Sequence, residues 1–191
     1  MSRILAFSGS ARRESYNQKL VRVAARGAAA AGADVTVIDL ADFPMPIFDE
    51  DLERREGMPE AAARFKQLLL EHDALLIASP EYNSAFSPLL KNAIDWASRA
   101  TSKDEPPLSA YRGKTAAILA ASPGGLGGMR GLVFLRLLLS NIGITVIPDQ
   151  IAVARAHEAF DAAGEMTDEK QRSSVEGIGA RLHAVARSLG S

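Results

Sequence analysis

Short apolar runs alternate with helical patterns along the chain, and this alternation constrains the fold more than any other sequence feature. The apolar runs are rich in aliphatic and β-branched residues, and they predict five strands: Ile4–Phe7, Val35–Ile38, Ala74–Ala78, Thr115–Ala121 and a region formed by residues 144–147 and 151–153. Strict strand–helix alternation is typical of βαβ units and a parallel sheet. Because such crossovers are right-handed, we expect an α/β three-layer sandwich with helices on both faces of the sheet.

Five helices are predicted between and after these strands. They cover residues 17–31, 59–72, 88–98 and 129–141, and a last helix begins near residue 167. Ser87-Pro88 places an N-cap residue before a proline that suits the first helical position. Spacings of three and four residues predict the sheet-facing side of the last helix: Val175, Ile178, Leu182, Val185 and Leu189. Two polar, proline-containing segments, residues 42–57 and 101–114, are predicted to be loops.

The length of 191 residues fits one α/β domain that spans residues 1–191. With 22 basic and 23 acidic residues the net charge is −1, which gives no electrostatic reason to expect nucleic acid or a membrane as a partner. The absence of cysteine excludes disulfides, thiolate metal sites and cysteine nucleophiles. His72, His157 and His183 show no ligand spacing, so no metal site is expected, and we interpret them as surface or hydrogen-bonded histidines.

No apolar run has the length of a signal peptide or approaches the ~20 residues of a membrane span. We therefore expect a cytoplasmic protein.

The loop after the first predicted strand reads Ser8-Gly9-Ser10-Ala11-Arg12-Arg13-Glu14-Ser15-Tyr16-Asn17. Hydroxyls, an amide and two arginines surround the start of a helix, where free backbone N–H groups point outward. That combination suits a phosphate group. The loop is neither a Walker A motif nor a dinucleotide fingerprint. The alternative is a capped helix behind a polar turn, with Ser15 or Asn17 as the cap.

The loop after the third strand contains Pro80, Tyr82, Asn83 and Phe86. The two aromatic side chains offer flat apolar surfaces, and the asparagine presents both donor and acceptor groups. A flavin ring needs such an apolar wall and hydrogen bonds to its polar edge. The alternative is a rigid turn whose aromatic side chains cap the core. In the helix behind it, Trp96 is expected in the core or at a subunit interface.

The loop after the fourth strand places four glycines within residues 124–128. Such a turn lets the backbone approach a ligand closely and present its N–H groups. The alternative is a flexible turn that needs positive φ angles. Ligands of open parallel sheets bind beyond the carboxyl ends of the strands, so we expect the three loops to share one crevice.

Together these loops resemble the NADPH-dependent FMN reductase family of the flavodoxin-like superfamily, which includes bacterial quinone and chromate reductases. The matching motifs are Gly9-Ser10-x-Arg12-x-x-Ser15-x-Asn17, then Pro80-Glu81-Tyr82-Asn83 with Leu90-Lys91-Asn92-Ala93-Ile94-Asp95-Trp96, and Ser122-Pro123-Gly124 through Gly128. They lie in the expected order within roughly residues 3–150. The resemblance implies a flavodoxin-like sandwich whose five parallel strands have the order 2-1-3-4-5.

The resemblance also implies an FMN site. Its cofactor-binding residues would be Ser8, Ser10, Arg12, Ser15, Tyr16, Asn17, Pro80, Glu81, Tyr82, Asn83, Ser122, Gly124 and Gly125. Ser10, Arg12, Ser15 and Asn17 would hold the phosphate, while the later residues would line the isoalloxazine. Glu14 is expected to face solvent. Members of the family are usually homodimers or homotetramers.

The implied function is an FMN-dependent NAD(P)H:acceptor oxidoreductase. NADPH or NADH would deliver hydride to flavin N5, and a quinone, free flavin or another small acceptor would then take its place, in a ping-pong mechanism without a catalytic side chain. One alternative is a flavodoxin-type electron carrier, although such carriers are typically strongly acidic and this chain is near neutral. A second is a flavin-free regulatory protein on the same fold.

Overall fold

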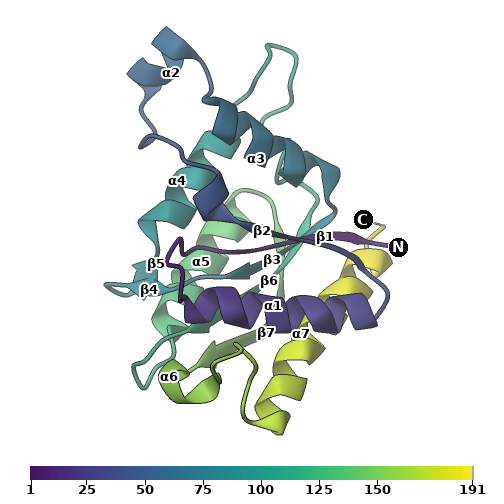
Figure 1. Ribbon diagram of the computed structural model, residues 1–191. Helices are drawn as coiled ribbons and strands as arrows, with labels where there is room; N and C mark the ends of the chain where they lie inside the picture. Colours follow the sequence, from purple (N-terminus) through teal and green to yellow (C-terminus); the bar gives the residue numbers. More distant parts are fainter. Residues whose placement is uncertain (191) are drawn as a thin grey trace.

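A computed structural model describes residues 1–190 and shows a five-stranded parallel sheet with helices on both faces (Figure 1). In sheet order its strands are β2 (Asp34–Asp39), β1 (Arg3–Ser8), β3 (Ala74–Ala78), β6 (Thr115–Ala121) and β7 (Thr145–Val153). Because β6 and β7 are the fourth and fifth strands of this sheet, the predicted order 2-1-3-4-5 is confirmed. The strand order reverses between β1 and β3, which is where such sheets bind ligands.

Two apolar layers sandwich the sheet. Helices α1 (Tyr16–Ala30) and α7 (Glu169–Ser188) cover one face, and α3 (Glu60–Glu71), α4 (Pro88–Ala97) and α5 (Met129–Asn141) cover the other. The central strands β3 and β6 are buried along their whole length, as expected for parallel strands covered on both faces. Trp96 is fully buried in α4, which excludes a cofactor contact and favours the core over a subunit interface, the two positions that the sequence left open.

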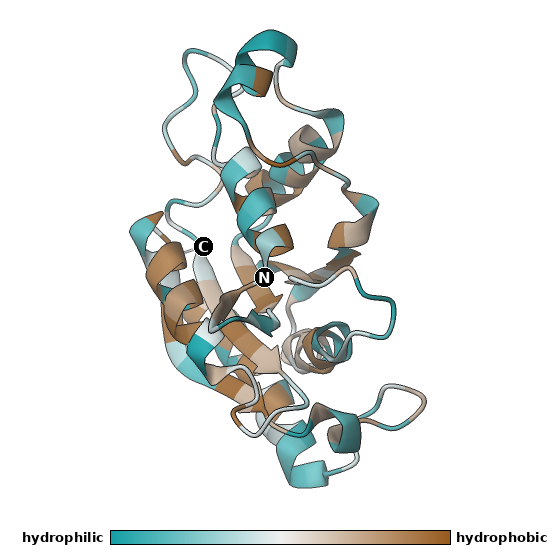
Figure 2. Ribbon diagram, turned by 90° about the vertical axis from the view of Figure 1, so that its left-hand side faces the viewer, coloured by the Kyte–Doolittle hydropathy of each residue, from teal (hydrophilic) through white to brown (hydrophobic). Residues whose placement is uncertain are grey.

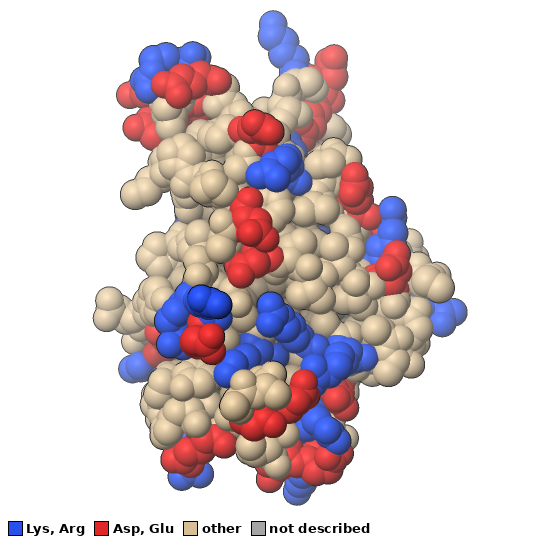
Figure 3. Space-filling view, viewed as in Figure 1, with Lys and Arg blue, Asp and Glu red and all other residues tan. Residues whose placement is uncertain are grey.

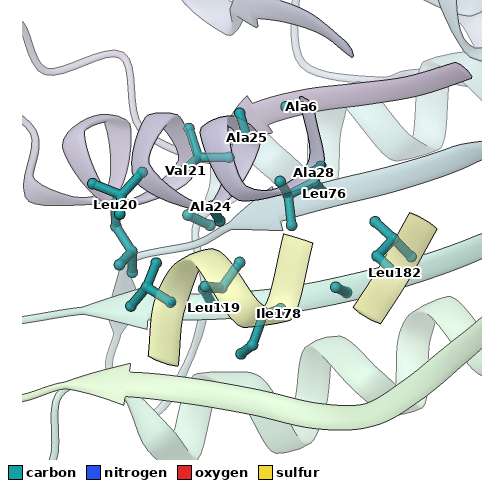
Figure 4. Packing of buried hydrophobic residues seen from close by; sticks show 14 of the residues in the cluster. Ala6, Leu20, Val21, Ala24, Ala25, Ala28, Leu76, Leu119, Ile178 and Leu182 are labelled. Atoms are coloured by element: carbon teal, nitrogen blue, oxygen red, sulfur yellow. The ribbon is translucent and has the colours of Figure 1, made fainter. Parts of the chain in front are cut away.

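Helices α1 and α7 cross at close range over β1, β3 and β6 (Figure 4). Two glycines permit this approach. A Cβ atom at Gly27 would lie 2.0 Å from the Glu176 carbonyl oxygen, and one at Gly179 would lie 2.0 Å from the Ala24 carbonyl oxygen. The backbones therefore occupy the space that side chains would need. Val175, Ile178 and Leu182 of α7 are buried as predicted.

The prediction of a loop throughout residues 42–57 was wrong. Residues Leu40–Asp42 form a 3₁₀ turn, and Glu50–Glu56 form helix α2, which projects at the top of Figure 1. Asp49 caps α2 by accepting hydrogen bonds from the Asp51 and Leu52 N–H groups. Acidic side chains occupy its first turn and arginines its last, which complements the helix dipole. No residue of α2 is buried, so it lacks the apolar periodicity that would have indicated a helix (Figure 2).

Three further predictions required correction. Residues Glu81–Tyr82 (β4) and Ala85–Phe86 (β5) form a small antiparallel hairpin, and Ala156–Ala159 form the short helix α6. Residues 1–190 therefore contain seven α-helices rather than five. Leu189 lies beyond α7 and is 58% exposed, because the helix ends at Ser188 before this residue can reach the sheet.

The segment 101–114 contains neither helix nor strand, as predicted, but one carboxylate anchors it. Glu105 forms an ion pair with Lys66 of α3, whose side chain is only 3% exposed. It also accepts hydrogen bonds from the Thr101 N–H (2.7 Å) and hydroxyl (2.8 Å) and from the Ser109 hydroxyl. Burial would raise the pKa of Glu105, but these hydrogen bonds outweigh it and lower the pKa to about 2.

Two of the three histidines form hydrogen bonds within the fold, and the third lies at the surface. His72 bonds to the Leu68 carbonyl and the Thr36 hydroxyl, and His183 bonds to the buried Ser2 hydroxyl. His157 is half exposed beside Glu158. No group of three side chains able to hold a metal ion occurs within residues 1–190. Over the same range, no helix has both the length and the apolar character needed to cross a membrane.

Candidate functional site

A pocket of about 330 Å³ lies at the carboxyl ends of β1, β3 and β6. The loops that follow these three strands all contribute to its wall, as the sequence predicted. Its lining consists of Ser10, Arg12, Ser15, Tyr16, Asn17, Pro80, Glu81, Tyr82, Ala121, Ser122 and Pro123.

The β1–α1 loop forms one end of the pocket. Its entry is tightly packed, since a Cβ atom at Gly9 would lie 3.0 Å from the Ser87 hydroxyl oxygen and 3.1 Å from the Leu90 Cβ. Ser8 and Ser10 are buried and shape the turn, because their hydroxyl oxygens accept the N–H groups of Ser10 (3.2 Å) and Arg12 (3.3 Å). The hydroxyls therefore hold the loop open around the start of α1.

Helix α1 begins at the pocket. Ser15 is the N-cap and accepts the Gln18 N–H at 3.4 Å, which confirms one of the two predicted caps. The N–H groups of Tyr16 and Asn17, in the first helical turn, donate to no acceptor within residues 1–190. A helix start with free N–H groups carries partial positive charge and favours an anion.

Arg12 adds a full positive charge at the same end. Its guanidinium lies 5.4 Å from the centre of the Tyr16 ring and forms no ion pair within the described residues. The Tyr16 ring itself stacks on Phe160, with centroids 6.2 Å apart. Arg12 is thus held near the helix start with its charge still available to a ligand.

The Asn17 side chain, unlike that of Arg12, has hydrogen-bond partners within the protein. Its amide donates to the Ala121 carbonyl and accepts the Ala121 N–H, both at 2.9 Å. Both functions of the side chain are therefore used to tie α1 to the end of β6. Asn17 lines the pocket, and it also fixes the start of α1 relative to the end of β6.

The β4–β5 hairpin forms the opposite end of the pocket. Its tip, Asn83 and Ser84, adopts positive φ angles of 50° and 71°, the pattern of a two-residue hairpin turn. Tyr82 projects from this hairpin and is 52% exposed, so its ring offers an apolar surface at the pocket mouth.

Glu81 fixes the hairpin to α5. Its carboxylate accepts the Arg130 Nε–H at 2.8 Å and the Gly131 N–H at 3.1 Å, and its side chain is only 7% exposed. Burial would raise the pKa of Glu81, but the Gly131 hydrogen bond and the Arg130 charge outweigh burial and hold the pKa below its usual value. The charge of Glu81 is therefore compensated within the protein.

The β6–α5 loop closes the site. Gly127 and Gly128 have φ angles of 62° and 92°, and a Cβ atom at either would lie 2.7 Å from a neighbouring atom, so both positions require glycine. Gly124 and Gly125 meet no such obstacle, because an added Cβ would have no neighbour closer than 3.7 Å. The space beside these two glycines is open, and the Gly125 N–H has no acceptor in the described chain.

The structure brings most of the predicted site residues together. The pocket lining contains Ser10, Arg12, Ser15, Tyr16, Asn17, Pro80, Glu81, Tyr82 and Ser122. Ser8, the last residue of β1, lies outside the lining, as do Asn83, Gly124 and Gly125 in the adjoining loops. Sequence reasoning missed Ala121 and Pro123, which stand on either side of Ser122 and could have been found from that position alone. Glu14 faces solvent as expected, with its side chain 75% exposed.

Comparison with known proteins identifies the family. The model of the NADPH-dependent FMN reductase family matches residues 2–158. The chain belongs to this family. It is 37% identical over 175 residues to an NAD(P)H-dependent FMN reductase of Pseudomonas aeruginosa, covering 91% of this chain and 89% of that protein. It is 34% identical to an NADPH:quinone oxidoreductase of Arabidopsis thaliana, covering 98% and 93% of the two chains.

A solved structure agrees over nearly the whole chain. The flavoenzyme NAD(P)H:(acceptor) oxidoreductase FerB of Paracoccus denitrificans superimposes with a TM-score of 0.81 at 28% identity, covering 98% of both chains. Membership of the family confirms the predicted resemblance, the oxidoreductase class, and FMN and NAD(P)H as cofactor and co-substrate.

Proposed function

We propose that the pocket binds FMN and that the protein transfers electrons from NAD(P)H to a small acceptor by a ping-pong mechanism. The observation that carries this proposal is the convergence of the three loops on one pocket with a cationic end and an apolar end. That arrangement suits a mononucleotide, whose phosphate and aromatic ring need opposite environments.

At the cationic end we assign the FMN phosphate to Ser10, Arg12 and Ser15, together with the free N–H groups at the start of α1. A guanidinium and two hydroxyls supply the donors that a phosphate dianion needs. We assign Asn17 a positioning role, since its amide is engaged by Ala121. This assignment differs from the phosphate contact that the family resemblance implied for Asn17.

At the apolar end we assign the isoalloxazine ring to the space between the β4–β5 hairpin and the β6–α5 loop. Pro80 and Tyr82 supply apolar surface, and the open space beside Gly124 and Gly125 lets the backbone approach the ring. Glu81 contributes by holding the hairpin in place through Arg130.

The bound flavin would supply the redox chemistry, by accepting two electrons from NAD(P)H and passing them to the acceptor. The protein would contribute position: the hairpin and the glycine loop would orient the ring, and free backbone N–H groups would favour negative charge on it. Because the half-exposed Tyr82 leaves the pocket mouth open, the nicotinamide and the acceptor would use one face in turn.

Steady-state kinetics test this function. The purified protein with FMN should oxidise NADPH or NADH when supplied with a quinone, free flavin, an azo dye, a nitroaromatic compound or chromate. Double-reciprocal plots at several acceptor concentrations should give parallel lines, since one substrate leaves before the other binds. Intersecting lines would contradict the ping-pong order. FMN binding without any NAD(P)H oxidation would favour an electron carrier.

We also propose that the protein forms a homodimer or homotetramer through α5. Val133, Phe134 and Leu137 are 61%, 49% and 67% exposed on this helix, beside the half-buried Phe86 of the hairpin. These side chains form an uncharged apolar strip, which a second copy of the chain can cover with its own strip around a two-fold axis.

A further inference from the structure

Cationic side chains gather on the outer face of α1. Lys19, Arg22 and Arg26 are three and four residues apart, so they project from the same side of the helix, and Arg13 precedes them in the loop. Figure 3 shows this group as a blue area over α1, low in the centre of the view. The chain as a whole carries a net charge of only −1, so the concentration of positive charge is local.

These cations line a recess of about 230 Å³ between α1 and the turn at residues 162–165. We call it the α1 recess. It is a separate space from the proposed FMN pocket, but Ser15 lines both. A ligand in the α1 recess would therefore lie next to the phosphate end of the flavin site.

The charges of the α1 recess are not balanced. Its lining contains four cationic side chains, of Arg13, Lys19, Arg22 and Arg26, and only two carboxylates, of Glu14 and Glu165. The Arg26 guanidinium is paired with Glu165 at 2.5 Å, whereas the Lys19 ammonium lies 4.0 Å from Glu14.

Within residues 1–190, neither Arg13 nor Arg22 forms an ion pair or a side-chain hydrogen bond. Two positive charges are thus left for an anion from outside the protein. The guanidinium group binds phosphate through paired N–H donors, so the chemistry favours a phosphate monoester.

We propose that the α1 recess binds the 2′-phosphate on the adenosine end of NADPH, and thereby selects NADPH over NADH. This inference rests on the proposed function, which brings the nicotinamide end of the same molecule to the neighbouring pocket. The two nicotinamide cofactors differ only in this phosphate. A surplus of two cations beside the flavin site therefore supplies a basis for discriminating between them.

Direct binding tests the proposal without turnover. Adenosine 2′,5′-bisphosphate and 5′-AMP are titrated into the FMN-loaded protein by calorimetry. The wild-type protein should bind the bisphosphate more tightly, and the double variant R13Q/R22Q should bind it about 10- to 100-fold more weakly, as expected for the loss of charged hydrogen bonds. The matched control R54Q/R55Q removes two arginines from exposed α2 and should bind it like the wild type.

Kinetics supply a second measurement. In R13Q/R22Q the KM for NADPH should rise at least about tenfold relative to the KM for NADH, with little change in the kcat for NADPH. Flavin fluorescence quenching reports whether the variants still fold and retain FMN.

Three results would overturn the proposal: equal affinity of the wild type for the bisphosphate and 5′-AMP, unchanged bisphosphate affinity in R13Q/R22Q, or equal weakening in R54Q/R55Q. Bisphosphate binding that needs Arg13 and Arg22, in a protein that oxidises neither nicotinamide, would support the α1 recess and count against the proposed function alone.

Discussion

At the scale of single residues, the site depends on how each polar group is engaged. The hydroxyl oxygens of Ser8, Ser10 and Ser15 accept hydrogen bonds from backbone N–H groups. The Asn17 amide both donates to and accepts from the Ala121 backbone. Arg12 differs because its charge is not compensated by a carboxylate of the described residues. Sequence patterns identified all of these residues as site candidates, but they could not show which ones have free groups.

Replacing Arg12 tests the phosphate end. We expect Arg12→Ala to weaken FMN binding by about 1.5–3 kcal/mol, a factor of roughly 10 to 150, because a charged hydrogen bond to the phosphate is lost. Fluorescence titration of the flavin-free protein measures this. Arg54→Ala, which removes one exposed arginine of α2, should leave FMN affinity unchanged. An unchanged affinity in Arg12→Ala would remove Arg12 from the site.

At the scale of elements, the sequence predicted what burial determines. The core strands and the helices that pack on them follow apolar periodicity, so β3, β6 and the end of α5 agree with the predicted boundaries. Helix α2 was missed because it has no buried face, and the β4–β5 hairpin because its two-residue strands are too short for a pattern. The close crossing of α1 and α7 could not be predicted either, because a glycine inside a helix does not show which element packs against it.

The glycine pair at that crossing gives a stability prediction. Gly179→Ala should destabilise the protein by about 1–3 kcal/mol, because the new Cβ would overlap the Ala24 carbonyl oxygen and push the helices apart. Gly177, on the same helix, has no atom within 4 Å of an added Cβ. Gly177→Ala should therefore stabilise the protein by up to about 1 kcal/mol through helix propensity. Urea denaturation compares the two variants, and equal effects would contradict the packing account.

Glu105, the anchor of segment 101–114, should make the stability of the protein depend on pH. Folding lowers the pKa of Glu105 from 4.5 to about 2. The unfolded chain therefore takes up the proton first, so the stabilisation is complete above pH 4.5 and is lost as pH falls toward 2. Glu105→Gln should cost about 2 kcal/mol at neutral pH, where a charged hydrogen-bond acceptor is lost. Denaturation curves at pH 7 and pH 3 should show this difference shrinking at the lower pH, and a constant difference would exclude the ion pair as its source.

At the scale of the whole molecule, the parallel sheet explains why distant segments meet. The loops after β1 and β6 lie more than a hundred residues apart along the chain, with the loop after β3 between them, yet all three emerge at one edge of the sheet. Strand order follows from general topological rules and from the family resemblance, so the location of the site could be predicted. The α1 recess and the exposed strip of α5 could not, because they depend on which side chains the tertiary structure leaves without partners.

The strip on α5 gives a prediction about assembly. Leu137→Glu should shift the protein to a smaller species in sedimentation velocity experiments, because a carboxylate would be buried in the interface. In the monomer this side chain is exposed, so the folded chain should tolerate the change. Arg54→Glu on the exposed helix α2 serves as a surface control. A wild-type protein that sediments as a monomer would contradict the proposed interface.

Equilibrium titration shows whether the three separate loops form a single FMN site. Flavin-free protein is added to FMN while flavin fluorescence is followed. We expect saturating fluorescence quenching at one FMN per chain, with the flavin retained on gel filtration. A protein that neither quenched nor retained FMN supplied in excess would contradict it.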